Sequence, residues 1–175
     1  MKNFVCAFLI FFASFFAFGQ NQEISKIISL RKKNLKPIKD QIINSIEDQR
    51  NNLITISDGI WEAAETSLEE FKSSKLLIDY ARANGFEVIE NVADISTAFM
   101  ATYGSGKPVI GILGEFDANA GISQKRQPTK EARVKGGAGH GCGHNLYGTA
   151  SLGAAVAIKE QIEKGNLKGT VIFYG

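Results

Sequence analysis

VIGILGEF, residues 109–116, is the most apolar stretch of the chain after its N-terminal segment. Its first five residues are all apolar or glycine, which predicts a strand buried on both faces at the centre of a sheet. Two strand-like segments precede it, at residues 86–91 and 97–103. The Gly- and Pro-containing segment 104–108 predicts a hairpin that pairs the second strand with the third.

Helical patterns flank these strands. Residues 145–164 carry many Ala and Gly, which allows close approach to a sheet, and a strand over 170–174 follows them. Upstream, apolar residues at helical spacing predict helix over residues 23–64. Residues 67–70, Ser-Leu-Glu-Glu, match a capping box that begins a further helix. We therefore expect an α/β domain, with N-terminal helices followed by a mixed sheet on which helices pack.

The composition excludes several classes of protein. A length of 175 residues fits about one domain. The net charge of +2 is too small for the basic surface of a nucleic-acid-binding module. Two cysteines are too few for a disulfide scaffold.

The first residues have the pattern of a secretory signal peptide. Lys2 precedes an uncharged apolar run over residues 4–18, and Ala17 and Gly19 are the small residues expected before a cleavage site. The run is shorter than the roughly 20 residues that span a bilayer, so no stable membrane anchor is expected. We expect cleavage after Gly19, export to the periplasm or the medium, and a mature domain over residues 20–175.

Both histidines, and the one cysteine outside that signal, fall in the five residues His140-Gly141-Cys142-Gly143-His144. Thiolate and imidazole are natural ligands of zinc, and the glycines let alternate side chains turn toward one centre. This pattern predicts a metal site. The alternatives are a tight turn with no ligand and an anion-binding loop that leads into the next helix.

Two further features bear on function. Asp117 directly follows the strand of residues 109–116, where ligands bind in open α/β sheets, and could orient a metal-bound imidazole; many strands also end in Asp simply to begin a turn. The loop from about residue 118 to residue 143 is basic. Its cations could attract a carboxylate substrate or form an ordinary solvated surface, and they are Lys125, Arg126, Lys130, Arg133 and Lys135.

The residues then resemble a known family. The strings GEFDANAGISQ (114–124) and GGAGHGCGHNLYGTASLGAAVA (136–157) resemble the aminoacylase/carboxypeptidase-type zinc metallopeptidases, in the amidohydrolase branch near the aminobenzoyl-glutamate hydrolases. The segments 60–88 and 97–108 are similar as well. The resemblance implies that the chain forms the N-terminal part of a metallopeptidase catalytic domain, without the lid or dimerisation domain that follows in the family.

The resemblance also implies roles for individual residues. Cys142 and His144 correspond to metal ligands, and Asp117 to the catalytic-site aspartate that orients a ligand near the metals. His140 corresponds to the leading histidine of the motif, a possible additional ligand or a residue behind the ligands. The general-base glutamate of the family follows the strand that ends at residue 174, beyond this chain, so we expect a fragment that is inactive by itself.

The function implied is hydrolysis of an amide bond by water activated on one or two divalent ions, Zn or Mn. The expected substrate is an N-acyl amino acid, an aminoacyl-glutamate or a small dipeptide, and full-length family members are expected to form homodimers. Two alternatives remain from the residues: a non-catalytic or vestigial metal-binding protein, and a module that binds a small anion in the glycine-rich loop without metal.

Overall fold

The computed structural model describes residues 25, 26, 28, 29 and 35–175 of the chain. The predicted signal peptide, residues 1–19, lies outside this part. The chain divides into two compact units, residues 1–41 and residues 42–175. All described residues of the first unit are helical. No helix in the described part is both long enough and apolar enough to cross a membrane.

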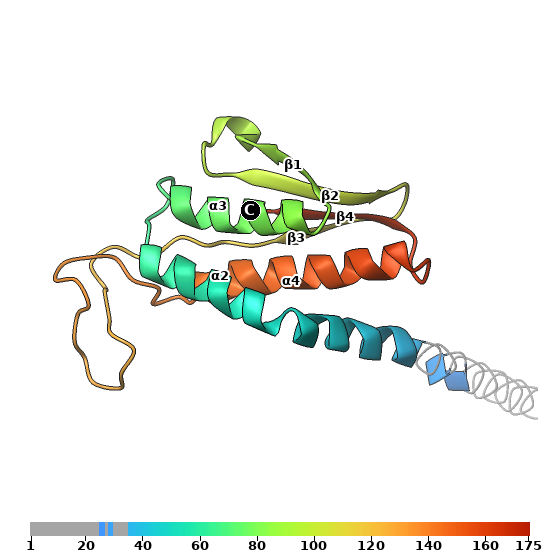
Figure 1. Ribbon diagram of the computed structural model, residues 1–175, viewed down its shortest axis with the longest axis horizontal. Coiled ribbons are helices and arrows are strands. Elements are labelled where there is room, and N and C mark those ends of the chain that lie inside the picture. The colour runs from blue at the N-terminus through green and yellow to red at the C-terminus, as the bar shows by residue number, and fades with distance from the viewer. Residues whose placement is uncertain (1–24, 27, 30–34) are drawn as a thin grey trace, which may run out of the picture. The chain divides into compact units, whose positions relative to one another are not determined.

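The second unit contains three helices and a four-stranded mixed sheet, which confirms the predicted α/β class (Figure 1). Residues 42–48 are also helical and precede the first of these helices. The elements, in chain order, are α2 (Arg50–Ala63), α3 (Phe71–Ala83), β1 (Glu87–Glu90), a short 3-10 turn (Val92–Asp94), β2 (Phe99–Ser105), β3 (Val109–Leu113), α4 (His144–Glu163) and β4 (Gly169–Tyr174).

The predicted hairpin between β2 and β3 is wrong, because the last strand lies between them. The strand order is β1-β2-β4-β3, with β4 antiparallel to β2 and parallel to β3. Two glycines make room for this insertion: a Cβ on Gly104 would lie 2.3 Å from the carbonyl oxygen of Gly169. The amide of Thr170 then donates to the carbonyl of Pro108 at 2.9 Å. The 104–108 segment therefore crosses over the start of β4 and does not close a hairpin.

The prediction that β3 is a central buried strand is also wrong. Among the described strands β3 pairs only with β4, so it is an edge strand. Val109 and Leu113 are each 55% exposed. An apolar sequence on both faces favours a buried strand but does not say which neighbours bury it. The strands with partners on both sides are β2 and β4.

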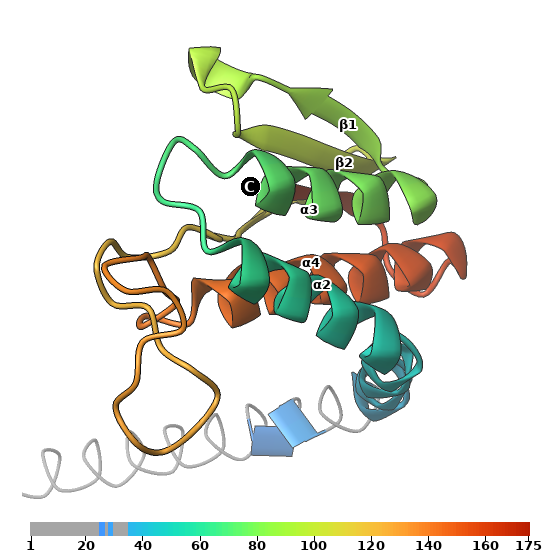
Figure 2. The ribbon, with the colours of Figure 1, turned by 60° about the vertical axis from the view of Figure 1, so that its left-hand side comes forward.

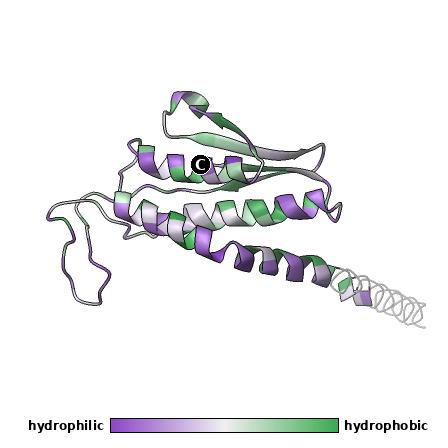
Figure 3. Ribbon diagram, viewed as in Figure 1, coloured by the Kyte–Doolittle hydropathy of each residue, from purple (hydrophilic) through white to green (hydrophobic). Residues whose placement is uncertain are grey.

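The core lies between the sheet and the helices. α3 contacts β1 and β2, whereas α4 contacts β2, β3 and β4, and α2 packs on these two helices (Figure 2). Phe99 of β2 and Phe173 of β4 are fully buried, with ring centroids 5.5 Å apart. In Figure 3 the middle of α4 is hydrophobic and its end is hydrophilic, as expected for a helix whose centre covers a sheet. The sheet and α4 thereby support the residues that follow β3 and those at the start of α4.

The predicted capping box at residues 67–70 is wrong, since no side-chain cap bonds the start of α3 from its N-cap residue Glu70. Glu65 takes that role from further upstream. Its carboxylate accepts hydrogen bonds from the backbone amides of Lys72 and Ser73 and from the Ser73 hydroxyl, at 2.8–3.1 Å. A carboxylate at a helix N-terminus satisfies free amides and interacts favourably with the helix dipole. Ser67 is thereby left free for another partner.

Candidate functional site

The first side chain of α4 meets the aspartate that follows β3. His144 Nδ1 lies 2.6 Å from Asp117 Oδ1, and the pair joins two segments separated by 27 residues. An ionised carboxylate can only accept a hydrogen bond, so Nδ1 carries a proton and donates a hydrogen bond to Asp117. The hydroxyl of Ser67 donates to the other oxygen of Asp117, Oδ2, at 3.2 Å. The imidazole is thus held in one orientation, with its second nitrogen, Nε2, directed elsewhere.

The surroundings of Asp117 favour its charged form. Partial burial alone raises the pKa of this carboxyl, but the hydrogen bonds from His144 and Ser67, with the electrostatic effect of the imidazole, outweigh it. The net effect holds the pKa of Asp117 below its ordinary value. At neutral pH Asp117 is therefore an anion next to the imidazole.

Glu115 lies at the remaining nitrogen of His144. Its Oε2 is 3.3 Å from His144 Nε2, and its side chain is about half exposed to solvent. Glu115 and Asp117 are two residues apart, so in extended chain their side chains would share a side. Glu115 was not among the predicted site residues. Its spacing of two residues from Asp117 is the feature of the sequence that could have identified it.

His140 uses one ring nitrogen within the fold. Its Nε2 lies 3.0 Å from the carbonyl oxygen of Ile60, an acceptor, so Nε2 carries a proton. Burial lowers the pKa of His140 and outweighs the hydrogen bond to Ile60, which by itself raises it. The neutral ring then has a lone pair on Nδ1. This nitrogen is buried and has no hydrogen-bond partner among the described residues.

The three metal-capable side chains of the 140–144 segment go to different surroundings. Cys142 is a free, exposed thiol, whereas His140 contacts Ile60 and His144 contacts Asp117. Within the described residues no group of three or more His, Cys, Asp or Glu side chains is arranged to hold a metal ion. The expected convergence of all three on one centre is therefore not observed, and the ligand assignments of Cys142 and His144 stay predictions.

Close packing of α4 against the end of β3 sets the position of His144. A Cβ on Gly148 would lie 2.8 Å from the carbonyl oxygen of Glu115, and one on Gly114 would lie 3.2 Å from the Cα of Gly148. Only residues without a side chain allow the helix backbone this near the 114–116 segment. The first turn of α4 is consequently held against the segment that carries Asp117.

A second segment supports Asp117 from the other side. The amide of Ala118 donates to the carbonyl of Glu65 at 2.7 Å, and Thr66 forms an isolated parallel bridge with Ala118. This pairing places Ser67 beside Asp117. In the sequence, Ser67 was interpreted as part of a helix cap, because it lies among polar residues just before α3.

The comparisons with known proteins agree with this architecture. No family model matches the chain. The chain is 47% identical over 137 residues to one subunit of the p-aminobenzoyl-glutamate hydrolase of Escherichia coli K12, an alignment that covers 77% of this chain and 28% of the relative. The family resemblance is confirmed. The chain is thus homologous to this amidohydrolase family over a segment that spans less than a third of that relative.

Two solved structures, one described as an aminohydrolase and one as a peptidase, share the fold. A candidate aminohydrolase from methicillin-resistant Staphylococcus aureus has a TM-score of 0.63 and 25% identity, over 77% of this chain and 34% of that one. A Bacillus subtilis protein described as a dinuclear metal binding peptidase of the M20 family has a TM-score of 0.56 and 24% identity, over 71% of this chain and 35% of that one. The second likeness concerns the fold alone.

The residues of this amidohydrolase homologue have the chemistry that a divalent metal requires. His144 has one nitrogen held by a carboxylate, the usual arrangement behind a metal-bound imidazole. The buried Nδ1 of His140 is a lone pair without a partner among the described residues, and Cys142 adds a thiol two residues later. Thiolate and imidazole donors suit zinc, and catalytic zinc sites ordinarily have three protein ligands. In residue type these donors suit a metal, although among the described residues they are not gathered around one centre.

Proposed function

We propose that this chain contributes part of the active site of a metal-dependent amide hydrolase. The observation that carries the proposal is the 2.6 Å contact of His144 Nδ1 with Asp117 Oδ1, in a segment homologous to a named hydrolase. An imidazole oriented in this way presents its other nitrogen as a metal ligand. Cys142 and His144 are the proposed ligands, with His140 as a further ligand or a residue behind them.

The residues of the chain have separable roles in this proposal. Asp117 fixes the ring orientation and the proton position of His144, and Ser67 fixes Asp117. Glu115 lies where it can exchange a proton with a group bound near His144 Nε2. A zinc or manganese ion, one or two in number, would supply Lewis-acid activation of water and of the amide carbonyl when bound.

The proposed substrate is an N-acyl amino acid, an aminoacyl-glutamate or a small dipeptide. The relative from E. coli is named for hydrolysis of p-aminobenzoyl-glutamate, in which an amide links an acyl group to an amino acid. Basic residues in the 122–135 segment are suited to the carboxylate that all three substrate types carry.

Metal analysis tests the proposed ligands. Cys142→Ala and His144→Ala are each expected to lower bound zinc or manganese by at least about tenfold after dialysis against limiting metal, because each removes a ligand. Tyr147→Phe serves as the control, since Tyr147 lies in the next turn of α4 with its ring near that of His144. Elemental analysis measures metal per chain. Equal metal content in the wild type and the Cys142/His144 double variant would refute the ligand assignment.

Hydrolysis separates the enzyme from a metal-binding protein without turnover. Release of the amino acid from an N-acyl amino acid, measured in the longest natural chain that contains this segment, is expected to require metal and to fall in the same variants. Metal binding without any metal-dependent hydrolysis would instead support the vestigial alternative.

We also propose that the chain is exported after removal of residues 1–19. The support is the order of a basic start, an apolar run and small residues before Gln20. N-terminal sequencing of the exported protein is expected to begin at Gln20. An intact Met1 in the exported fraction would contradict cleavage at this position.

A further inference from the structure

A small cavity lies beside the 140–144 segment, between the end of α2 and the basic loop. Its volume is about 190 Å³, and its lining includes Trp61, Arg126, Arg133 and His140. It therefore adjoins the proposed metal site and shares His140 with it, whereas Cys142 and His144 do not line it. The volume suits a functional group of a ligand more than a whole drug-sized molecule.

The indole of Trp61 positions two guanidinium groups at this cavity. Cζ of Arg126 lies 4.3 Å and Cζ of Arg133 lies 5.0 Å from the indole ring. Cation–π contacts of this kind hold a guanidinium in a defined orientation. An oriented planar fork recognises a carboxylate through two parallel hydrogen bonds.

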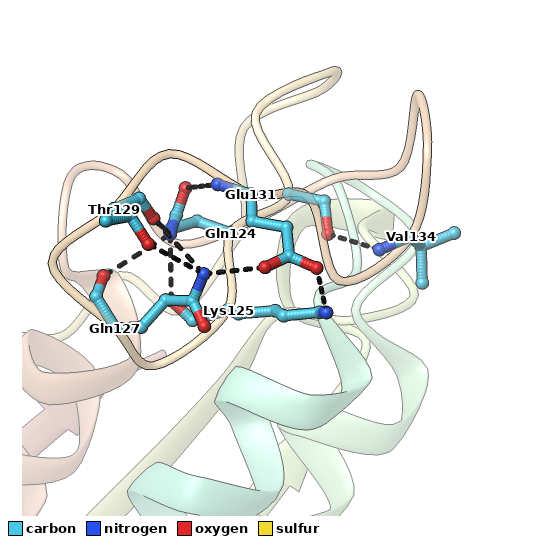
Figure 4. A network of polar contacts seen from close by, with 7 residues as sticks. Gln124, Lys125, Gln127, Thr129, Glu131 and Val134 are labelled. Atoms are coloured by element: carbon cyan, nitrogen blue, oxygen red, sulfur yellow. Dashed lines mark hydrogen bonds and ion pairs between the residues drawn. The ribbon is translucent and has the colours of Figure 1, made fainter.

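Of the three cations in the lining, two have carboxylate partners. Lys125 pairs with Glu131, inside a loop network that also includes the Gln124 and Gln127 side chains (Figure 4). Arg126 pairs with Asp58 at 2.9 Å. The charges of Lys125 and Arg126 are therefore balanced within the fold.

Arg133 differs from both. Its Nη1 donates to the backbone carbonyl of Glu62 at 3.0 Å, and among the described residues no carboxylate pairs with it. A guanidinium has five N–H donors, so most of those of Arg133 stay available. Among the described residues, Arg133 is thus the one Lys or Arg of the lining without a carboxylate partner.

We propose that this cavity binds one carboxylate group through Arg133, and that the group is the carboxylate of the amino-acid part of the amide substrate. Assignment of that carboxylate to the substrate rests on the proposed function; its binding to Arg133 does not. Arg133 is then a specificity-determining residue, and Trp61 positions it. The basic loop is in this respect a binding surface and not only a solvated face.

Trp61 is the only tryptophan of the chain, so its indole N–H signal in an NMR titration reports on this cavity alone. With metal removed by EDTA, N-acetyl-L-alanine is expected to shift this signal saturably, and N-acetyl-L-alaninamide, which lacks the charge, is not. Arg133→Gln is expected to raise the dissociation constant about tenfold or more, the loss typical of one charge-assisted contact. Lys135→Gln removes a cation of the same loop outside the cavity lining and is expected to bind like the wild type.

Several results would overturn the inference. Equal affinity of the wild type and Arg133→Gln, equal binding of the amide, or an equal loss in Lys135→Gln would exclude a carboxylate site at Arg133. If the glutamine variant does not fold, Arg133→Lys keeps the charge but loses the fork, and unchanged affinity would exclude bidentate recognition. Equal affinity for acetate would overturn assignment to the substrate. Because metal is absent throughout, failure here is distinct from failure of the metal-dependent hydrolase.

Discussion

Asp117→Asn is expected to weaken metal binding at His144 by about ten- to a hundredfold, the range typical when the partner of a metal-bound imidazole is altered. Asparagine can still accept a hydrogen bond from His144 Nδ1, but it removes the negative charge 2.6 Å away that makes the ring a better ligand. Its amide can also turn and offer an N–H to the same nitrogen, which would favour the wrong proton position on the ring. Zinc titration with a competing chelator measures the change.

The matched control for this substitution is Asp79→Asn. Asp79 pairs with Lys75 at 2.8 Å on the exposed surface of α3, where an ion pair contributes at most about 1 kcal/mol. Asp79→Asn is therefore expected to leave metal affinity unchanged. Similar affinities for Asp117→Asn and Asp79→Asn would show that Asp117 does not orient a ligand.

The contribution of Asp117 to the free energy of unfolding is expected to decrease at acidic pH. Because its pKa is lower in the folded chain than in the unfolded one, its charge stabilises the fold above the ordinary carboxyl pKa, about 3.9. This stabilisation is lost as the pH falls below that value through the lower folded pKa. The difference in unfolding free energy between the wild type and Asp117→Asn should be constant above about pH 5 and shrink below about pH 4. Urea unfolding across this range measures it.

Gly148→Ala is expected to lower the free energy of unfolding by about 1–3 kcal/mol, as is typical of overpacking in a well-packed interior. Alanine favours a helix over glycine by about 1 kcal/mol, but here its methyl group would lie 2.8 Å from the carbonyl oxygen of Glu115. Backbone cannot move aside as a side chain does, so the first turn of α4 must shift away from the 115–117 segment. The contact of His144 with Asp117 should lengthen, and metal affinity should fall together with stability.

Gly153→Ala separates the steric effect from helix propensity. Gly153 lies on the same helix, and its added methyl group would meet the end of the flexible Leu53 side chain at 2.9 Å. Leu53 can adjust, so we expect a stability close to that of the wild type and unchanged metal affinity. Equal destabilisation by the two alanines in urea unfolding would contradict the proposed role of the Gly148 contact.

Periodicity alone was sufficient for the local elements. The helix predicted over 145–164 is α4, and the strands predicted near 86–91, 97–103 and 170–174 are β1, β2 and β4. The long irregular stretch between β3 and α4 was also predicted. These features depend on neighbouring residues, whose spacing decides which side of a helix or strand is apolar.

Strand order could not be predicted in the same way. The hairpin prediction assumed that neighbours in sequence are neighbours in space, whereas β4 pairs with β2 and β3 across more than 60 residues. Gly104 and Gly169 allow the close approach of β2 and β4. A glycine in the sequence does not, however, identify the segment that packs against it. The observed order brings Phe99 and Phe173 together in the buried core, and that contact joins residues far apart in the sequence.

The amino-acid sequence by itself determined the residue types of the candidate site, because two imidazoles and one thiol lie within five residues of one another, and it determined the family through the same motif. Tertiary structure decided how those groups are used. His144 meets Asp117 because α4 packs closely on the end of β3. Glu131 and Asp58 pair with Lys125 and Arg126, whereas Arg133 has no carboxylate partner among the described residues. Contacts between distant segments follow from packing and charge pairing in the folded chain, which no local pattern contains.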